Sequence, residues 1–237
     1  MRGRKDREGV DCELIINYVK EYRGEMKKVG TRKLHYLLQR QLEISGIKCG
    51  RDKLFSLLRR EGLLIRRKRA RRYTTTCSQP VAKFFPNLIK DITINDPEVV
   101  WASDTTALAV RDGLGYLTLT TDVYSKQIMG YNVQRTRQSS GSLMTLRMAL
   151  NKRKYPERQL IHHSDGGGEY FNHLYLQELV KAHVKISCTA PSSPQENAVA
   201  ERINGILKQE FLLVEDHRSF EDILKKLPEV IRIYNER

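Results

Sequence analysis

The segment VVWASDTTALAVRDGLGYLTLTTDVYSKQIMGYNV, residues 99–133, alternates runs of β-branched and aromatic residues with short turn sequences. Such runs favour strands, and we expect three of them, at residues 99–110, 116–124 and 128–133. The glycine-containing turn at residues 112–115 and the break at Ser125-Lys126 are short enough to join neighbouring antiparallel strands. The segment therefore predicts a three-stranded antiparallel meander.

Downstream of the meander, helical and strand-like patterns alternate. We expect two short strands, at residues 160–163 and 185–189, and helices at 142–152, 172–183 and 196–211, followed by a last helix that runs from a Ser219 cap toward Tyr234. The order βββ-α-β-α-β-α, in which two parallel strands follow three antiparallel ones, is typical of an α/β, ribonuclease-H-like core. We place this core at residues 96–237.

Upstream of the meander, the pattern is helical. We expect helices at residues 11–22, from a Thr31 cap onward, and at 52–60, where Gly62 ends the last one. Two short helices joined by a glycine-containing connection indicate an all-α helix-turn-helix domain over residues 1–65. The alternative is an ordinary three-helix bundle with a charged surface. In the first reading, the DNA-contacting residues of the last helix are Arg51, Lys53, Arg59 and Arg60.

The positive charge is concentrated in the first part of the chain. Residues 1–90 hold 24 Lys and Arg against 9 Asp and Glu, whereas the remaining residues hold 18 against 19, and the whole chain has a net charge of +14. Such an asymmetry predicts a polyanionic partner, most simply DNA, with a solvated basic surface as the alternative. A basic, extended linker at residues 66–95 would contact phosphates through a run of six side chains, Arg66, Arg67, Lys68, Arg69, Arg71 and Arg72.

Other classes of protein fit the sequence less well. The chain contains no apolar run near the length of a membrane span, and no apolar stretch follows its basic N-terminus as in a signal peptide. Its 4 cysteines are far apart and form no CxxC pair, which disfavours a disulfide framework and fits a reducing cytosol. The histidines at 162, 163, 173 and 183 match no zinc-ligand spacing.

Three carboxylates are candidates for catalysis and for metal binding. Asp104 lies in the first predicted strand, Asp165 directly follows the fourth, and Glu201 lies on the helix after the fifth. A central first strand would bring all three to one edge of the sheet, where oxygen ligands suit Mg²⁺ or Mn²⁺. Two such ions can support phosphodiester chemistry. We interpret Asp122 as structural, and the rival glutamates on the same helix are Glu196 and Glu210.

The residues around these carboxylates resemble a known family. Four motifs carry the resemblance, namely residues 100–106 (VWASDTT), 122–131 (DVYSKQIMGY), 163–165 (HSD) and 196–205 (ENAVAERING), and 35 residues separate Asp165 from Glu201. This spacing resembles the D,D(35)E signature of integrases and transposases. The motifs are similar to those of the second-frame transposase of the insertion-sequence-three family, and residues 30–72 resemble the helix-turn-helix that precedes the core in that family.

The resemblance implies metal-dependent DNA strand cleavage and strand transfer at the ends of an insertion sequence. It implies DNA ends and target DNA as partners, a homo-oligomer on DNA, an upstream-frame transposase protein as a further partner, and a cytoplasmic location at the bacterial nucleoid. Two features depart from the family pattern: Gly166 to Glu169 replace the usual residues after the second aspartate, and the chain stops at Arg237, where we expect a C-terminal truncation. The alternatives are a catalytically defunct DNA-binding remnant and a ribonuclease-H-like nuclease without transposition.

Overall fold

The structure, a computed structural model, describes residues 2–65, 85–189, 197–211 and 218–236. The chain divides into two compact units, one built on the first three helices and one built on a sheet with its helices. Within the ranges that the structure describes, no helix is both long and apolar enough to cross a membrane. The rival glutamate Glu196 and the six basic residues predicted to contact DNA between 66 and 72 lie outside the described residues.

The helical unit contains α1 (Arg2–Glu25), α2 (Thr31–Ile44) and α3 (Arg51–Arg60). α1 is much longer than the predicted helix at 11–22. Leucines at helical spacing form the buried faces of α2 and α3, at positions 34, 38, 42, 54, 57 and 58. One detail of the prediction is wrong: Gly30 is the N-cap of α2 and makes no side-chain cap, whereas Thr31 is already the first helical residue and is buried. Gly62, with a φ of 66°, follows α3 as predicted.

The second unit is built on a five-stranded sheet with the order β3-β2-β1-β4-β5. Its strands are β1 (Val100–Val110), β2 (Gly113–Asp122), β3 (Ile128–Gln134), β4 (Ile161–Ser164) and β5 (Lys185–Cys188). The pairs β1–β2 and β2–β3 are antiparallel, and the pairs β1–β4 and β4–β5 are parallel. This confirms the meander, the two parallel strands and the central position of β1.

The connection between β1 and β2 is shorter than predicted. Only Arg111 and Asp112 separate the two strands, and Gly113 already pairs with Val110. Gly113 has a φ of 123°, a backbone conformation that a residue with a side chain rarely adopts. The predicted turn at 112–115 therefore belongs largely to β2, because the glycine reverses the chain at the strand end.

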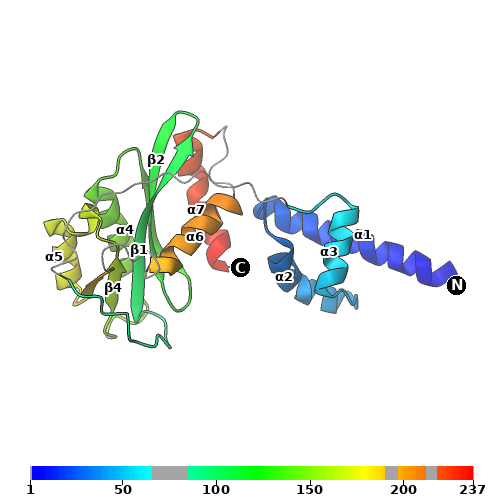
Figure 1. Cartoon of the computed structure of the whole chain (residues 1–237), viewed down its shortest axis with the longest axis horizontal. Coiled ribbons are helices and arrows are strands. Elements are labelled where there is room, and N and C mark those ends of the chain that lie inside the picture. The colour runs from blue at the N-terminus through cyan, green and yellow to red at the C-terminus, as the bar shows by residue number, and fades with distance from the viewer. Residues whose placement is uncertain (1, 66–84, 190–196, 212–217, 237) are drawn as a thin grey trace. The chain divides into compact units, whose positions relative to one another are not determined.

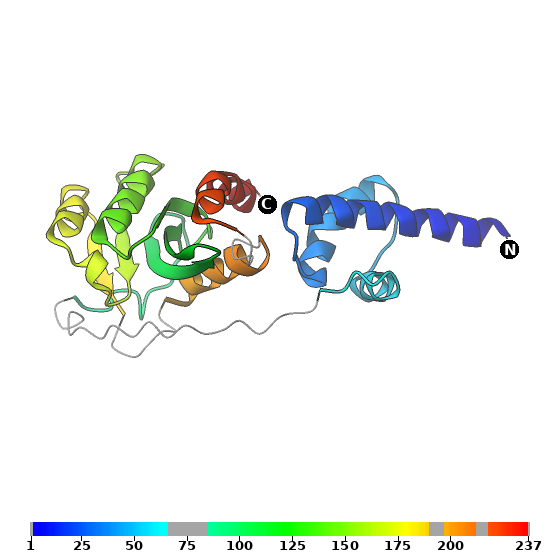
Figure 2. The ribbon, with the colours of Figure 1, turned by 90° about the horizontal axis from the view of Figure 1, so that it is seen from above.

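Helices cover both faces of the sheet (Figures 1 and 2). One face carries α4 (Ser139–Asn151) and α5 (His173–Lys181), and the other carries α6 (Ala198–Gln209) and α7 (Phe220–Glu236). Trp101 of β1 is fully buried under the first pair, in a cluster with Leu146 of α4 and Leu179 of α5. The order of strands and helices is that of the predicted ribonuclease-H-like core.

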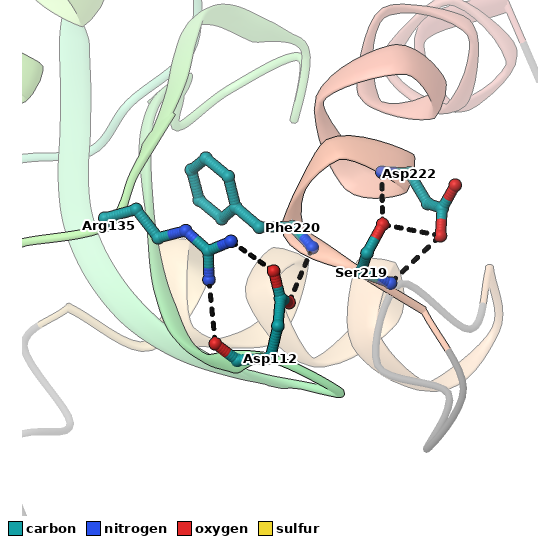
Figure 3. Close-up of polar contacts among 5 residues, drawn as sticks. All are labelled: Asp112, Arg135, Ser219, Phe220 and Asp222. Atoms are coloured by element: carbon teal, nitrogen blue, oxygen red, sulfur yellow. Dashed lines mark hydrogen bonds and ion pairs between the residues drawn. The ribbon is translucent and has the colours of Figure 1, made fainter.

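The N-terminus of α7 is attached to the tip of the β1–β2 hairpin (Figure 3). The backbone N–H of Phe220 donates to Asp112 Oδ1 at 3.0 Å. Arg135 pairs with the same carboxylate, and its guanidinium lies 4.3 Å from the centre of the Phe220 ring. Ser219 and Asp222 cap the helix reciprocally, since Asp222 N–H donates to Ser219 Oγ and Ser219 N–H donates to Asp222 Oδ2. The Ser219 cap is thus confirmed.

The chain that enters the second unit covers the β5 edge of the sheet. Cys188 N–H donates to the carbonyl of Pro86 at 3.3 Å, and Leu88 N–H donates to Ser187 Oγ at 2.9 Å. Phe85 stacks on Phe171 with ring centres 5.4 Å apart. Part of the segment predicted as an extended linker therefore packs on the sheet, and it satisfies polar groups that an edge strand would expose.

Candidate active site

Asp104 and Asp165 are brought together by the register of two parallel strands. Ser103 of β1 pairs with Ser164 of β4, so the two aspartates follow paired positions on neighbouring strands. Both side chains are partly buried. Asp104 directly follows Ser103, and Asp165 directly follows Ser164. Because backbone pairing of the two strands fixes the two serines, the proximity of the aspartates does not depend on a long loop.

The sheet face that carries Asp104 is covered by α6. Asn204 Nδ2 donates to Asp104 Oδ2 at 2.7 Å, and Lys208 donates to the hydroxyl of Thr106, two residues along the same face of β1. Asn197, just before α6, donates from Nδ2 to the carbonyl of Ser103 at 3.0 Å. These three contacts align α6 along β1 beside Asp104.

Glu201 lies in the first turn of the same helix. It precedes Asn204 and Lys208 by three and seven residues, a spacing that puts all three side chains on one side of α6. Its charge reaches Asp104, yet its side chain is exposed. Across the residues that the structure describes, no three Asp, Glu, His or Cys side chains converge closely enough to hold a metal ion. The structure thus groups Asp104 with Asp165 and leaves Glu201 beside them, facing solvent.

The electrostatics of the site reflect buried groups of like charge. Burial raises the pKa of Asp104, the hydrogen bond from Asn204 opposes this rise, and the charge of Glu201 adds to it. Burial and, after it, the charge of Asp104 raise the pKa of Asp165 to about 6. Burial lowers the pKa of Lys208, against the effect of Asp104. Carboxylates held in this way favour the approach of a positive charge.

A buried polar network supports β1 on the opposite face. His162 Nε2 lies 2.9 Å from Ser103 Oγ and 2.8 Å from the hydroxyl of Tyr175. Ser103 Oγ also lies 2.8 Å from Thr120 Oγ1. Burial lowers the pKa of His162 to about 3, so the ring is neutral at physiological pH. Its ring Nε2 is engaged inside the core, and this histidine therefore has a structural environment rather than that of a zinc ligand.

The loop after Asp165 is tight and contains a further carboxylate. Gly167 N–H donates to Asp165 Oδ1 at 3.1 Å, and Tyr170 N–H donates to the carbonyl of Gly167 at 3.1 Å. Glu169 is buried and pairs with Arg137 at 2.7 Å. The hydroxyl of Tyr170 lies 2.9 Å from Thr105 Oγ1, which joins this loop to the strand that carries Asp104.

Two other acidic residues have structural contacts. Asp122 accepts from the N–H of Glu98 at 2.6 Å and from the N–H of Ser125 at 2.7 Å, as expected for a residue that shapes a turn. Glu210 forms an ion pair with Lys33 at 2.9 Å. These contacts agree with the interpretation of Asp122 as structural, and the carboxylate of Glu210 is engaged by Lys33 of α2.

The predicted DNA-contacting side chains of α3, Arg51, Lys53, Arg59 and Arg60, are all exposed. Arg51 pairs with the neighbouring Asp52 at 3.0 Å and Arg60 with Glu61 at 3.1 Å, across side chains that are largely solvated. Exposed pairs of this kind contribute little to stability. The guanidinium groups can therefore exchange these partners for another anion at small cost.

Sequence reasoning missed Asn204 and Lys208. The signal was available, because both residues recur at helical spacing after Glu201 and therefore share its side of the helix. The prediction considered only the acidic residues of α6. The Arg137–Glu169 pair was also missed, and its partners are too far apart in the sequence for any spacing rule to connect them.

Comparisons with known proteins give consistent matches. The family described as integrase core domain matches residues 95–194, and a second family with the same description matches residues 182–237. The 31 kDa protein of insertion element IS600 from Shigella sonnei is 31% identical over 237 residues, which cover 98% of this chain and 84% of that protein.

Further relatives are named as transposases. The transposase for IS904 from Lactococcus lactis is 25% identical over 90% of this chain and 82% of that protein. The transposase InsF for IS3A from Escherichia coli is 31% identical over 65% of this chain and 53% of that protein. Among solved structures, the HTLV-2 integrase catalytic core domain in complex with magnesium has a TM-score of 0.41 at 19% identity, covering 59% of this chain and 83% of that one.

Proposed function

This chain belongs to the insertion-sequence-three family of DDE transposases, with an integrase core domain that acts in DNA transposition, and we propose that Asp104, Asp165 and Glu201 are its catalytic carboxylates. The observation that carries this proposal is the pairing of β1 with β4, which sets two partly buried aspartates side by side. Glu201 is the third member because its charge reaches Asp104 from the helix that covers the same face.

The same residues fit a divalent cation. Asp104 and Asp165 are oxygen donors. Burial and, after it, the charge of Asp104 raise the pKa of Asp165, so a cation between the two carboxylates would relieve a cost that the fold imposes. Oxygen donors of this kind suit Mg²⁺ or Mn²⁺. When bound, such cations activate an attacking oxygen and stabilise the leaving oxygen of a phosphodiester. Asp104 and Asp165 would hold the cation, with Glu201 completing the set.

The surrounding side chains have positioning roles in this proposal. Asn204 holds the carboxylate of Asp104 through its 2.7 Å hydrogen bond. Lys208 supplies a positive charge on the same side of α6, where it can act on the phosphate backbone of bound DNA. A transposase supplies orientation and charge stabilisation rather than a covalent intermediate, so rigid placement of these groups is what the chemistry requires.

DNA reading is assigned to the helical unit. We propose that α2 and α3 form a helix-turn-helix whose Arg51, Lys53, Arg59 and Arg60 contact the ends of the element. The exposure of all four side chains supports this assignment. The basic residues between 66 and 72 would contact phosphates, which adds affinity without sequence preference. The joining of two DNA ends further suggests a homo-oligomer on DNA, with the upstream-frame protein as an additional partner.

A second reading is a catalytically defunct DNA-binding remnant. The exposed side chain of Glu201 and the lack of a three-ligand cluster among the described residues favour it. The two readings differ in a single assay, strand transfer by the full chain on DNA that carries the element's ends, with Mg²⁺ and with EDTA. Joined products that require Mg²⁺ and the element's ends support the transposase. Binding without products supports the remnant, and cutting of any DNA without joining supports a nuclease.

A further inference from the structure

Glu169 is a buried carboxylate in the loop that carries Asp165, and Arg137 is its partner. Arg137 Nε lies 2.7 Å from Glu169 Oε1, and the two side chains are 26% and 7% exposed. Arg137 lies in the connection between β3 and α4, whereas Glu169 follows β4. Since β3 and β4 both run in the same direction as β1, the two connections leave the sheet at the same end, where these strands finish.

The carboxylates of Glu169 and Asp165 lie on either side of Gly167. A Cβ atom on Gly167 would stand 2.9 Å from Asp165 Oδ1 and 2.9 Å from Glu169 Oε2. Gly167 also donates its N–H to Asp165 Oδ1 at 3.1 Å. The loop therefore closes with two acidic side chains near one another, and only a residue without a side chain fits between them without displacing a carboxylate.

Both members of the pair act electrostatically on Asp165. Glu169 places a negative charge on the other side of Gly167 from Asp165, and Arg137, bound to Glu169 Oε1, places a positive charge beside it. A buried carboxylate without a partner is strongly destabilising, and Arg137 supplies that partner. Because the two charges are adjacent and opposite, their effects on Asp165 partly cancel.

We propose that Arg137 and Glu169 are positioning residues, which fix the loop of Asp165 and balance the charge around the cation that the proposed function places there. The inference rests on that proposed function, because it needs a cation at Asp165. The pair is not assigned as ligands, since Glu169 Oε1 is taken up by Arg137. Its role is to set the strength with which the neighbouring carboxylates attract a divalent cation.

This role predicts shifts of opposite sign. Glu169→Gln keeps an oxygen that accepts from Arg137 but removes a negative charge, so Mn²⁺ binding should weaken by about tenfold. Arg137→Gln removes the positive charge instead, and Mn²⁺ binding should strengthen by a similar factor. The double variant should return to within about twofold of the wild type, because the two charge changes cancel. Arg137→Lys keeps the charge and should also stay near the wild type.

Isothermal titration of the whole 237-residue chain with Mn²⁺ measures these affinities, and thermal denaturation in EDTA measures folding separately. The Arg147–Glu178 pair is a matched control. It joins α4 to α5 at 2.7 Å, and its side chains are 56% and 21% exposed. None of the contacts of Asp165 described above involves this pair. Arg147→Gln and Glu178→Gln make the same charge changes in the same unit. They should change Mn²⁺ affinity less than about twofold, because exposed charges are screened.

Shifts of opposite sign that cancel in the double variant support the inference. Shifts of the same sign, or lower melting temperatures in EDTA with unchanged Mn²⁺ affinity, would overturn it and leave the pair with a structural role alone. Asp165→Asn separates this failure from that of the proposed function. If Asp165→Asn binds Mn²⁺ as the wild type does, the proposed cation site is wrong and the inference falls with it.

Discussion

At the scale of single residues, the charge of Asp165 opposes folding. Burial and the charge of Asp104 raise its pKa to about 6, above the value of an exposed aspartate. A raised pKa means that the folded state binds the proton more tightly than the unfolded state does. The resulting stabilisation is complete at low pH and is lost as the pH rises through about 6.

Asp165→Asn should therefore stabilise the protein in EDTA at pH 7, by roughly 1 to 2 kcal/mol after allowance for solvent screening. The gain should disappear at about pH 2 to 3, below the pKa of an exposed aspartate, where the side chain is protonated in both states. Thermal denaturation at the two pH values measures it, with the exposed Asp91→Asn as a control. A variant less stable than the wild type at pH 7 would show that Asp165 makes favourable contacts that outweigh its repulsion.

The sequence predicted the two aspartates of the site better than their surroundings. Asp104 and Asp165 could be placed together because parallel pairing with the central strand brings the end of β4 beside Asp104, which lies inside β1. The exposed orientation of Glu201 was not predictable. The rotation of a helix about its own axis depends on how the helix packs, and the spacing of residues in the sequence does not reveal it. In α6 the buried positions are Ala200, Ile203, Asn204 and Leu207, which leaves Glu201 next to the buried face rather than within it.

At the scale of elements, Gly130 sets the distance between β3 and α4. A Cβ atom at this position would stand 2.1 Å from the carbonyl oxygen of Thr145 and 3.2 Å from the backbone nitrogen of Ala149. Both obstacles are backbone atoms of α4, so the helix itself would have to move. The close approach explains why the predicted strand contains a residue with low strand propensity.

Gly130→Ala should lower the free energy of unfolding by about 2 to 3 kcal/mol, the usual cost of overpacking a well-packed contact. Urea denaturation measures this change. Gly205→Ala is the matched control, since Gly205 lies inside α6 with open space where its Cβ would stand, and alanine there should be neutral or stabilising. Equal stability of the Gly130→Ala protein and the wild type would mean that α4 is free to shift.

Elements with a strong hydrophobic period were predictable to within a few residues, whereas elements without such a period were not. The strands of the meander and the four helices of the second unit were expected within a few residues of their observed bounds. The short turn of 3-10 helix at Gly168–Tyr170 was missed, because three residues are too few to show a helical period. The length of α1 was also missed, since its first part has no apolar stripe for a pattern to reveal.

At the scale of the whole molecule, charge separates the proposed reading and cutting parts. The excess positive charge lies in residues 1–90, whereas the remaining residues are close to neutral. Replacement of Arg66, Arg67, Lys68 and Arg69 by Ala should weaken binding to all DNA sequences alike. The slope of log affinity against log salt should fall by about 3 to 4, which is close to one unit per lost phosphate contact.

Arg51→Ala combined with Lys53→Ala should have a different effect. These two residues open α3, where side chains of a recognition helix reach base edges, so the preference for the element's ends should fall by about 1 to 3 kcal/mol per base contact. Gel-shift titrations on end-bearing and unrelated DNA compare the two sets of variants. Loss confined to one DNA sequence in the basic-run variant would instead show that this run reads bases.

The most direct test of the account is strand transfer by the full chain with Asp104→Asn, Asp165→Asn or Glu201→Gln, on DNA carrying the element's ends in Mg²⁺. Each change removes one charge from the proposed cation site and leaves the helical unit intact. All three variants should bind the DNA ends as the wild type does and give no detectable joined product. Glu210→Gln, the control at the rival glutamate, which pairs with Lys33, should stay active. Robust strand transfer by the Glu201→Gln protein would contradict the assignment.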